Sequence, residues 1–249
     1  MYARQTLNTR GHLVLYRAVP DDITNDLRTL ARDSTTLWIH DTWNNVDFDD
    51  NRFQAFVPDS TARALTVDLE RHYRTFFDEG SASEWHFLKT VAGADDQLVR
   101  REFAPRISGE ESMDVTSVPG SMYLALEDNT FFYAFGWNNH IAMLSNRHLI
   151  RLKQGDIVLF RGDCMYARVG YAGNNVCVHG FIDTPQYARP KYQPPNIVPV
   201  MDDTRLVDDC FCFAFNCPFR ASSPNSLRKH LNRFHGFYFR STGGRAAAP

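Results

Sequence analysis

The chain has 249 residues, of which 43% are hydrophobic and 22% are charged, and its formal net charge is −2. These values are typical of soluble globular proteins and exclude collagen-like, coiled-coil and wholly disordered chains. No stretch approaches the roughly 18 consecutive apolar residues of a membrane span, and the N-terminus lacks the apolar region of a signal peptide. We therefore expect an intracellular protein of the nucleus or cytoplasm that is not secreted and has no membrane partner.

The N-terminal part of the chain predicts one strand followed by two helices. Residues 11–18 read as a strand, and the turn at residues 19–22 begins a helix with apolar residues at helical spacing. A second helix is expected from about residue 60 to residue 77, because its apolar residues form one stripe and its charged residues lie elsewhere. Two helices are therefore expected in the first 80 residues.

From about residue 97 the pattern changes to short runs of Val, Ile, Phe and Tyr separated by Gly, Asn and Asp. Such runs with turn signals between them are typical of a β-sandwich or a small barrel. The candidate strands are residues 98–103, 121–126, 130–135, 146–151, 156–161 and 175–183. We therefore expect an all-β core over residues 97–184.

The remainder of the chain is expected to form three further segments. Five prolines fall between residues 185 and 199, so we interpret residues 185–204 as a proline-rich linker that isolates the preceding domain, residues 1–184. Residues 205–240 would form a second, smaller domain, and the Gly- and Ala-rich residues 241–249 a disordered tail.

Four metal-binding side chains in the second domain have the spacing of a zinc site. They follow the pattern Cys212-x4-Cys217-x12-His230-x4-His235, with Cys210 as a less favoured alternative to Cys212. A Zn²⁺ ion takes four N or S ligands and supplies folding free energy that a segment of roughly 30 residues cannot obtain from its own core. The segment resembles a Cys2His2 zinc finger, which implies a ββα unit and Zn²⁺ as its cofactor.

Helix signals around the two histidines support this resemblance, with one departure. Ser223 is suited to cap the helix N-terminus, Pro224 favours the first helical position, and the glycine after the last histidine can end the helix. The finger family usually has an aromatic residue four positions after the second cysteine, where this chain has Ala221. Phe219 or Phe215 would have to fill that part of the core.

The finger would contact either a nucleic acid or a protein. The helix positions that face bases in zinc fingers correspond to Ser223, Ser226 and Lys229, and only the lysine is a strong base reader. Arg228 and Arg233 would add contacts to phosphates. The expected binding to nucleic acid is therefore weak and of low sequence specificity. A protein partner or a purely structural role stays open.

Two of the candidate strands resemble a second family. Residues 154–163, with the sequence Gln-Gly-Asp-Ile-Val-Leu-Phe-Arg-Gly-Asp, and residues 175–183 look like the C-terminal strands of the double-stranded β-helix in Fe(II)/2-oxoglutarate-dependent dioxygenases. The resemblance implies a jelly roll over residues 97–184, with residues 11–79 as helical support. The expected fold class is α+β: N-terminal helices supporting a double-stranded β-helix, plus a small C-terminal ββα zinc finger.

The residues that this family uses for catalysis are altered here. In the family a His-x-Asp pair and a distal His hold iron, and an Arg binds 2-oxoglutarate. The matching positions in this chain hold Arg100, Glu102, Tyr166 and Cys177. The cationic side chain of Arg100 would repel Fe²⁺, and among the iron-ligand positions only Glu102 keeps a suitable ligand type. Cys177 and His179 lie on one face of their strand, so a rearranged site with Glu102 and His179 stays open.

Two functions are therefore compared. The first is a non-catalytic oxygenase-like protein that carries Zn²⁺ in its finger and binds nucleic acid or protein. The second is an active dioxygenase with unusual ligands, which would need Fe²⁺ and 2-oxoglutarate and would act on nucleic acid or protein. A third interpretation keeps the pocket but lets Arg100 and Arg101 receive an anion.

Overall fold

The computed structural model describes residues 2–42, 48–103, 118–137, 139–187, 194–204, 210–212, 214, 217–221 and 223–237. The expected tail at residues 241–249 lies outside this set. So do Phe215, suggested as part of the finger core, and the side chain of Cys210.

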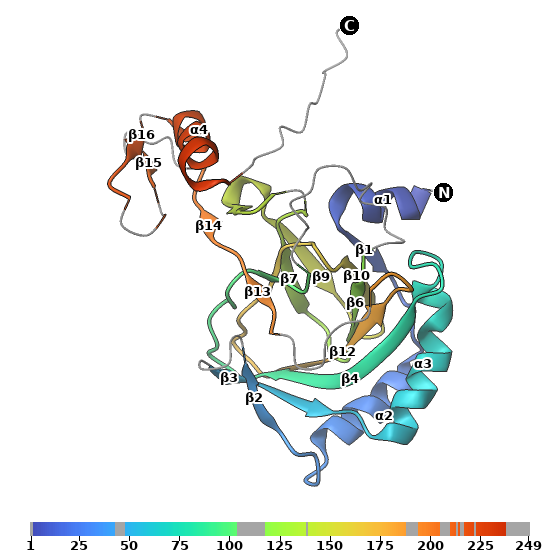
Figure 1. The fold of residues 1–249 in the computed structure, drawn as a ribbon. Helices are drawn as coiled ribbons and strands as arrows, with labels where there is room; N and C mark the ends of the chain where they lie inside the picture. Colours follow the sequence, from blue (N-terminus) through green and yellow to red (C-terminus); the bar gives the residue numbers. More distant parts are fainter. Residues whose placement is uncertain are drawn as a thin grey trace, which may run out of the picture.

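Two antiparallel β-sheets form the body of the protein (Figure 1). The larger sheet has seven strands in the order β1-β10-β6-β12-β4-β3-β2, and the smaller has five in the order β13-β5-β11-β7-β9. The strands of the larger sheet are β1 (His12–Leu15), β2 (Ile39–Thr42), β3 (Phe48–Phe56), β4 (Ser81–Thr90), β6 (Gly120–Ala125), β10 (Ile157–Arg161) and β12 (Asn175–Asp183). Those of the smaller sheet are β5 (Arg100–Arg101), β7 (Thr130–Ala134), β9 (His148–Leu152), β11 (Tyr166–Arg168) and β13 (Asn196–Ile197). Many neighbouring strands are distant in sequence, as a jelly roll requires.

The hydrophobic core lies on both sides of the larger sheet. On its outer side, helices α2 (Asp21–Arg32) and α3 (Asp59–Tyr73) cover the sheet with apolar residues such as Leu27 and Leu65 (Figure 1). On its inner side, the two sheets share a second cluster that includes Tyr123, Phe132, Phe160 and Tyr166, each at most 3% exposed. The inner cluster occupies the region where the sequence places the degenerate iron site.

The α+β class and the jelly roll are confirmed. The predicted helices correspond to α2 and α3, and the predicted strands between residues 121 and 183 correspond to β6, β7, β9, β10 and β12. Sequence patterns do not predict α1 (Tyr2–Arg10), β3 or β4, although β3 and β4 are long strands of the larger sheet. β3 begins with a polar run, and β4 contains a bulge beside Glu84, whose φ is +51°, so neither strand keeps simple alternation.

The segment expected to be a linker forms two strands against the jelly roll. β13 pairs with β5, and β14 (Val200–Met201) pairs in parallel with β8 (Ala142–Met143), which the 3₁₀ helix η2 (Leu144–Asn146) follows. Short edge strands tolerate flanking prolines, and Val198 and Met201 are buried. Residues 194–201 therefore run along the jelly roll instead of spanning open solvent.

The C-terminal unit consists of a hairpin and a helix. Strands β15 (Cys210–Phe211) and β16 (Arg220–Ala221) pair in antiparallel fashion, and helix α4 (Pro224–His235) follows. Among the helices that the structure describes, none is both long and apolar enough to cross a lipid bilayer.

Candidate functional site

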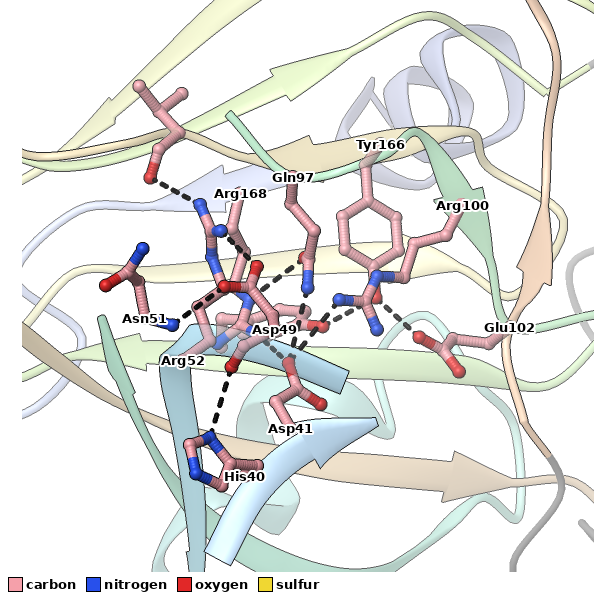
Figure 2. Close-up of polar contacts among 12 residues, drawn as sticks. His40, Asp41, Asp49, Asn51, Arg52, Gln97, Arg100, Glu102, Tyr166 and Arg168 are labelled. Carbon is pink, nitrogen blue, oxygen red and sulfur yellow. Dashed lines mark hydrogen bonds and ion pairs between the residues drawn. The ribbon is translucent and has the colours of Figure 1, made fainter. Parts of the chain in front are cut away.

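The jelly-roll interior brings together three residues at positions matched with the iron ligands. Arg100 on β5 is directly opposite Tyr166 on β11, and Glu102 follows β5. The Tyr166 hydroxyl donates a hydrogen bond to Glu102 Oε1 over 2.5 Å (Figure 2). The Tyr123 hydroxyl lies 2.6 Å from that of Tyr166, and because the Tyr166 proton is used by Glu102, Tyr123 is the donor to Tyr166. These three side chains form one continuous hydrogen-bond chain.

Tyr123 and Tyr166, the two tyrosines of this hydrogen-bond chain, are held in the neutral form. Burial raises the pKa of Tyr166 and of Tyr123, and the Glu102 carboxylate raises each of them further. The positive charge of Arg100 acts in the opposite direction on both groups, but burial and the Glu102 carboxylate outweigh it. Neither tyrosine therefore offers an anionic oxygen to a metal at neutral pH.

Beside this chain, the buried carboxylate of Asp41 on β2 is shared by two arginines (Figure 2). Its Oδ2 accepts hydrogen bonds from Arg168 Nη2, from Gln97 Nε2 at 3.3 Å and from Arg100 Nη2 at 3.5 Å. Burial alone would raise the pKa of Asp41, but attraction to Arg168 and Arg100 outweighs it and lowers the pKa. Burial likewise opposes the charge of Arg100, and attraction to the carboxylates of Asp41 and Glu102 more than offsets it, so its pKa is raised. The position matched with the first iron ligand thus carries a fixed positive charge.

The arginines proposed to receive an anion make internal contacts. Arg100 binds Asp41, whereas Arg101 donates Nε to Asn196 Oδ1 on β13 and Nη1 to the Asn139 carbonyl oxygen, both over 3.3 Å. These contacts disfavour the interpretation of an anion site at the two arginines.

Aromatic side chains pack against the hydrogen-bond chain. Tyr166 stacks on Phe160 with ring centroids 4.6 Å apart, and Tyr123 stacks on His179 at 4.4 Å. Cys177 belongs to the same apolar cluster, and burial raises the pKa of its thiol to about 12. Cys177 therefore stays neutral and packs as a small apolar residue.

The donor set of the interior does not fit Fe²⁺. A triad of two imidazoles and one carboxylate needs neutral nitrogen donors, and the matching positions hold a guanidinium and a neutral phenol. Within the described residues, a group of three or more His, Cys, Asp or Glu ligand atoms converges only in the C-terminal unit. A rearranged site on Glu102 and His179 therefore has no third ligand of these types within the described part of the chain.

Four side chains of the C-terminal unit converge on one point. The ligand atoms of Cys212, Cys217, His230 and His235 all lie within 4.8 Å of one another. His230 Nε2 is 3.3 Å from Cys217 Sγ and 3.1 Å from His235 Nε2. Ligands about 2.0–2.3 Å from a tetrahedral Zn²⁺ are roughly 3.3–3.8 Å apart, so two thiols and two imidazoles at this spacing fit the ion.

The hairpin places the two cysteines of this cluster. Cys212 directly follows β15, and its backbone N–H donates to the Phe219 carbonyl oxygen across the hairpin over 2.9 Å. Cys217 lies in the connection between the strands, where its N–H donates to the Ala214 carbonyl oxygen over 3.0 Å. Backbone hydrogen bonds therefore help to position both thiols.

The helix places the two histidines, as the capping signals predict. Ser223 Oγ accepts a hydrogen bond from the Ser226 N–H over 3.2 Å, and Pro224 occupies the first turn. The helix ends at His235, because Gly236 takes the left-handed conformation with φ +69°. Phe219 stacks on the His230 ring at 3.8 Å instead of filling the unit's core.

Two of the five predicted nucleic-acid contacts are exposed and three have local partners. Lys229 and Arg233 project from exposed positions of α4. Ser223 donates its hydroxyl to Ser226 Oγ over 3.0 Å, so these hydroxyls serve the helix cap. Arg228 Nη2 lies 3.5 Å from Asp203 Oδ2. Lys229 and Arg233 therefore carry exposed positive charge on the helix, and Arg228, whose side chain is 43% exposed, lies beside Asp203.

Sequence reasoning does not single out several members of the interior cluster, namely Asp41, Gln97, Tyr123 and Arg168. Arg168 could have been found, because strand alternation places it on the same face as Tyr166. Asp41 comes from a strand far away in the sequence, and no local pattern connects it to its partners.

No family model and no curated protein matches this sequence. Solved structures do match. HygX from Streptomyces hygroscopicus, with nickel and 2-oxoglutarate bound, has a TM-score of 0.59 and 9% sequence identity, over 80% of this chain and 96% of HygX. The non-heme α-ketoglutarate-dependent epimerase SnoN from nogalamycin biosynthesis has a TM-score of 0.58 and 9% identity, over 81% of this chain and 95% of SnoN. AviO1 from Streptomyces viridochromogenes Tue57 has a TM-score of 0.55 and 12% identity, over 76% of this chain and 96% of AviO1.

The body of this protein thus has the jelly-roll fold found in 2-oxoglutarate-dependent oxygenases and epimerases. At these low identities the similarity concerns the fold alone. The chain combines that fold with a cluster of buried aromatic side chains in its interior and a separate group of four Cys and His side chains that could hold a metal ion.

Proposed function

We propose that this chain is a non-catalytic oxygenase-like protein whose C-terminal finger binds Zn²⁺ and contacts another macromolecule. Its domains would be the jelly roll (residues 1–184), a connecting segment (185–204) and the finger (205–240). The observation that carries the non-catalytic assignment is the pairing of Arg100 with Asp41 and of Tyr166 with Glu102. HygX was solved with nickel and 2-oxoglutarate bound, whereas the matching interior here contains a fixed cation and neutral phenols.

The assignment of Zn²⁺ rests on the ligand types. A tetrahedral set of two thiolates and two imidazoles is typical of structural zinc sites. When bound, the ion would supply folding free energy to a unit with little core of its own. Thiolate ligands also require a reducing compartment, which is consistent with the nucleus or the cytoplasm.

The non-catalytic assignment is tested by anaerobic titration with Fe²⁺ and 2-oxoglutarate. The full chain carrying Cys217→Ser is used beside the wild type, so that iron held by the finger thiols is not counted. We expect no charge-transfer absorbance in the anaerobic titration and no succinate after O₂ is then admitted. A working 2-oxoglutarate oxygenase gives the absorbance without O₂ and, once O₂ is present as the oxidant, releases succinate and CO₂. If the Cys217→Ser protein binds one Fe²⁺ per chain and releases succinate, the protein is an active dioxygenase instead.

Weak binding to nucleic acid is the favoured role of the finger. Lys229 and Arg233 are exposed, and Arg220 adds a further exposed cation on β16. Each phosphate contact contributes about −0.9 to the slope of log K against log salt on duplex DNA. A salt titration of the zinc-loaded full chain with mixed-sequence DNA and RNA tests this role.

A double variant sharpens the titration. Lys229→Ala with Arg233→Ala should reduce the slope by about two units, because two phosphate contacts are lost. Arg63→Ala with Lys153→Ala removes the same charge from exposed positions of the jelly roll and should leave the slope unchanged. Equal effects of the two pairs would indicate a general charge effect and reject a finger-specific contact.

Exposed aromatic side chains favour a protein partner as the second candidate. Phe211 is 52% exposed and Phe234 is 66% exposed, on the hairpin and the helix of the finger. Aromatic residues of this kind are often the anchors of protein interfaces. Absence of nucleic-acid binding at about 50 mM salt would make protein recognition the better assignment.

A further inference from the structure

The C-terminal unit lacks part of its own core. Ala221, where the finger family has an aromatic residue, is only 4% exposed. It belongs to a buried cluster with Leu227 and Leu231 of α4. The same cluster contains three residues from outside the unit, Ile141, Met143 and Met201. Side chains of the jelly roll and of the connecting segment therefore occupy space that an independent finger fills for itself.

Backbone pairing holds the connecting segment in place below this cluster (Figure 1). β14 pairs with β8 so that Met201 is beside Met143, and the Ala142 N–H donates to the Pro199 carbonyl oxygen over 2.9 Å. One residue earlier, the Val198 N–H donates to the Val99 carbonyl oxygen over 2.8 Å, next to the pairing of β13 with β5. The segment is thus fixed to both β8 and β5.

The carboxylate of Asp203 connects the jelly roll, the connecting segment and the C-terminal unit. It accepts hydrogen bonds from the Ser145 N–H over 2.8 Å and from Ser145 Oγ over 2.5 Å, at the 3₁₀ helix after β8. Arg228 Nη2 of α4 lies 3.5 Å from Oδ2, the oxygen that also accepts from Ser145 Oγ, and the Asp203 side chain is 5% exposed. A charged contact therefore reinforces the apolar one.

We infer that the metal site is a clamp: Ile141, Met143, Met201 and Asp203 position the finger that carries the four ligands, and the bound metal in turn holds β13 and β14 on the jelly roll. This inference rests on the proposed zinc binding. Because free-energy coupling between two parts is reciprocal, zinc must stabilise the jelly roll by as much as the jelly roll strengthens zinc binding. A finger on an isolating linker would produce neither effect.

The tryptophans provide a selective measurement of the jelly roll. All four lie at positions 38, 43, 85 and 137, and none lies in the C-terminal unit. Thermal unfolding of the full chain, followed by tryptophan fluorescence, should occur at least about 5 °C lower after zinc is removed by a chelator. Cys217→Ser should lower the transition similarly and be insensitive to the chelator. If the protein carries zinc and its unfolding temperature does not change when the chelator removes that zinc, the clamp is overturned.

Zinc affinity measured by competition with a chromophoric chelator gives the reciprocal test. Met201→Ala should weaken zinc binding at least about tenfold, with one zinc per chain still bound at saturation. Val200→Ala changes the neighbouring exposed residue of β14 and should leave the affinity within about twofold. Asp203→Asn, which preserves shape, provides a milder variant with an expected loss of about threefold in case Met201→Ala does not fold.

The outcomes separate the two levels of the proposal. A chain that binds no zinc at all rejects both the proposed finger and the clamp. One zinc per chain, with equal affinities in the wild type, Met201→Ala and Asp203→Asn, rejects the clamp and keeps the zinc finger. One zinc, a lowered transition on chelation and weaker binding in Met201→Ala support both.

Discussion

The jelly-roll interior and the C-terminal cluster both gather polar side chains, yet they arrange them in opposite ways. In the interior each group meets its complement: Asp41 faces two guanidinium groups, and Tyr166 donates to Glu102. In the cluster, potential metal ligands face one another, as with Nε2 of His230 and Nε2 of His235 at 3.1 Å, or Cys217 Sγ and His230 Nε2 at 3.3 Å. A cation between such groups would be held by the lone pairs of thiolates and neutral imidazoles. Complementarity between neighbours therefore separates a polar core from a metal-binding site, even where the residue types overlap.

Removal of Asp41 is expected to have the largest effect on the interior. Asp41→Ala leaves Arg100 and Arg168 buried without their shared carboxylate, which should cost about 3–5 kcal/mol of unfolding free energy. Urea unfolding followed by tryptophan fluorescence measures the loss. Asp68→Ala, at an exposed position of α3, is the matched control. A loss below about 1 kcal/mol would mean that the interior charges do not depend on one another.

Acid should destabilise the jelly roll through the buried side chain of His12. Burial, and the neighbouring His148, lower the pKa of His12 on β1 to about 4, whereas the unfolded chain has the ordinary value of 6.5. Below 6.5 the unfolded state binds a proton that the folded state refuses, so stability falls by up to about 3 kcal/mol as the pH drops from 6.5 to 4. His12→Phe should lose this part of the pH dependence. Identical pH profiles of the two proteins, measured after zinc removal, would contradict the assignment.

Loss of one hydroxyl from the interior chain should have an intermediate effect. Tyr166→Phe keeps the stacking on Phe160 but leaves Tyr123 and Glu102 without their shared partner, at a cost of about 1–3 kcal/mol. Tyr16→Phe, at an exposed residue, should change the unfolding free energy by less than about 0.5 kcal/mol. Equal effects of the two substitutions would indicate that the hydrogen-bond chain adds nothing to stability.

The helix cap of the finger should have the smallest effect. Ser223→Ala removes the acceptor for the Ser226 N–H and should cost about 1 kcal/mol, which corresponds to about fivefold weaker zinc binding. Chelator competition measures this change. The control substitution Ser223→Asp keeps an oxygen that can cap the helix and should retain the wild-type affinity for zinc.

Local sequence patterns predict the parts of the molecule whose residues act on their neighbours. β10 contains four consecutive apolar residues and β12 two apolar runs separated by His179 and Gly180, so both strands are evident. The spacing of Cys212, Cys217, His230 and His235 likewise selects the residues that the structure brings together. The resemblance to the oxygenase family likewise selects Arg100, Glu102 and Tyr166, which meet in the interior.

Long-range pairing accounts for what sequence patterns do not predict. Asp41 meets Arg168 although the two lie on strands of different sheets, β2 and β11, and the bulge within β4 beside Glu84 hides this strand from simple alternation. The prolines before residue 200 are typical of a linker, and they give no indication that Met201 enters a buried cluster with Met143. Such contacts depend on which surfaces meet, and a single sequence does not encode that locally.

The two-residue strand β5 has a partner on each side, β11 and β13. If the chain were cut near residue 185, where its composition suggests a domain boundary, β13 would be lost and Arg100 and Arg101 would lie on an open sheet edge. Arg101 would also lose its partner Asn196, and the backbone groups of β5 that pair with β13 would be left to water. A shortened jelly roll should therefore be less stable than the full chain, because residues after the apparent boundary complete a sheet of the domain that precedes them.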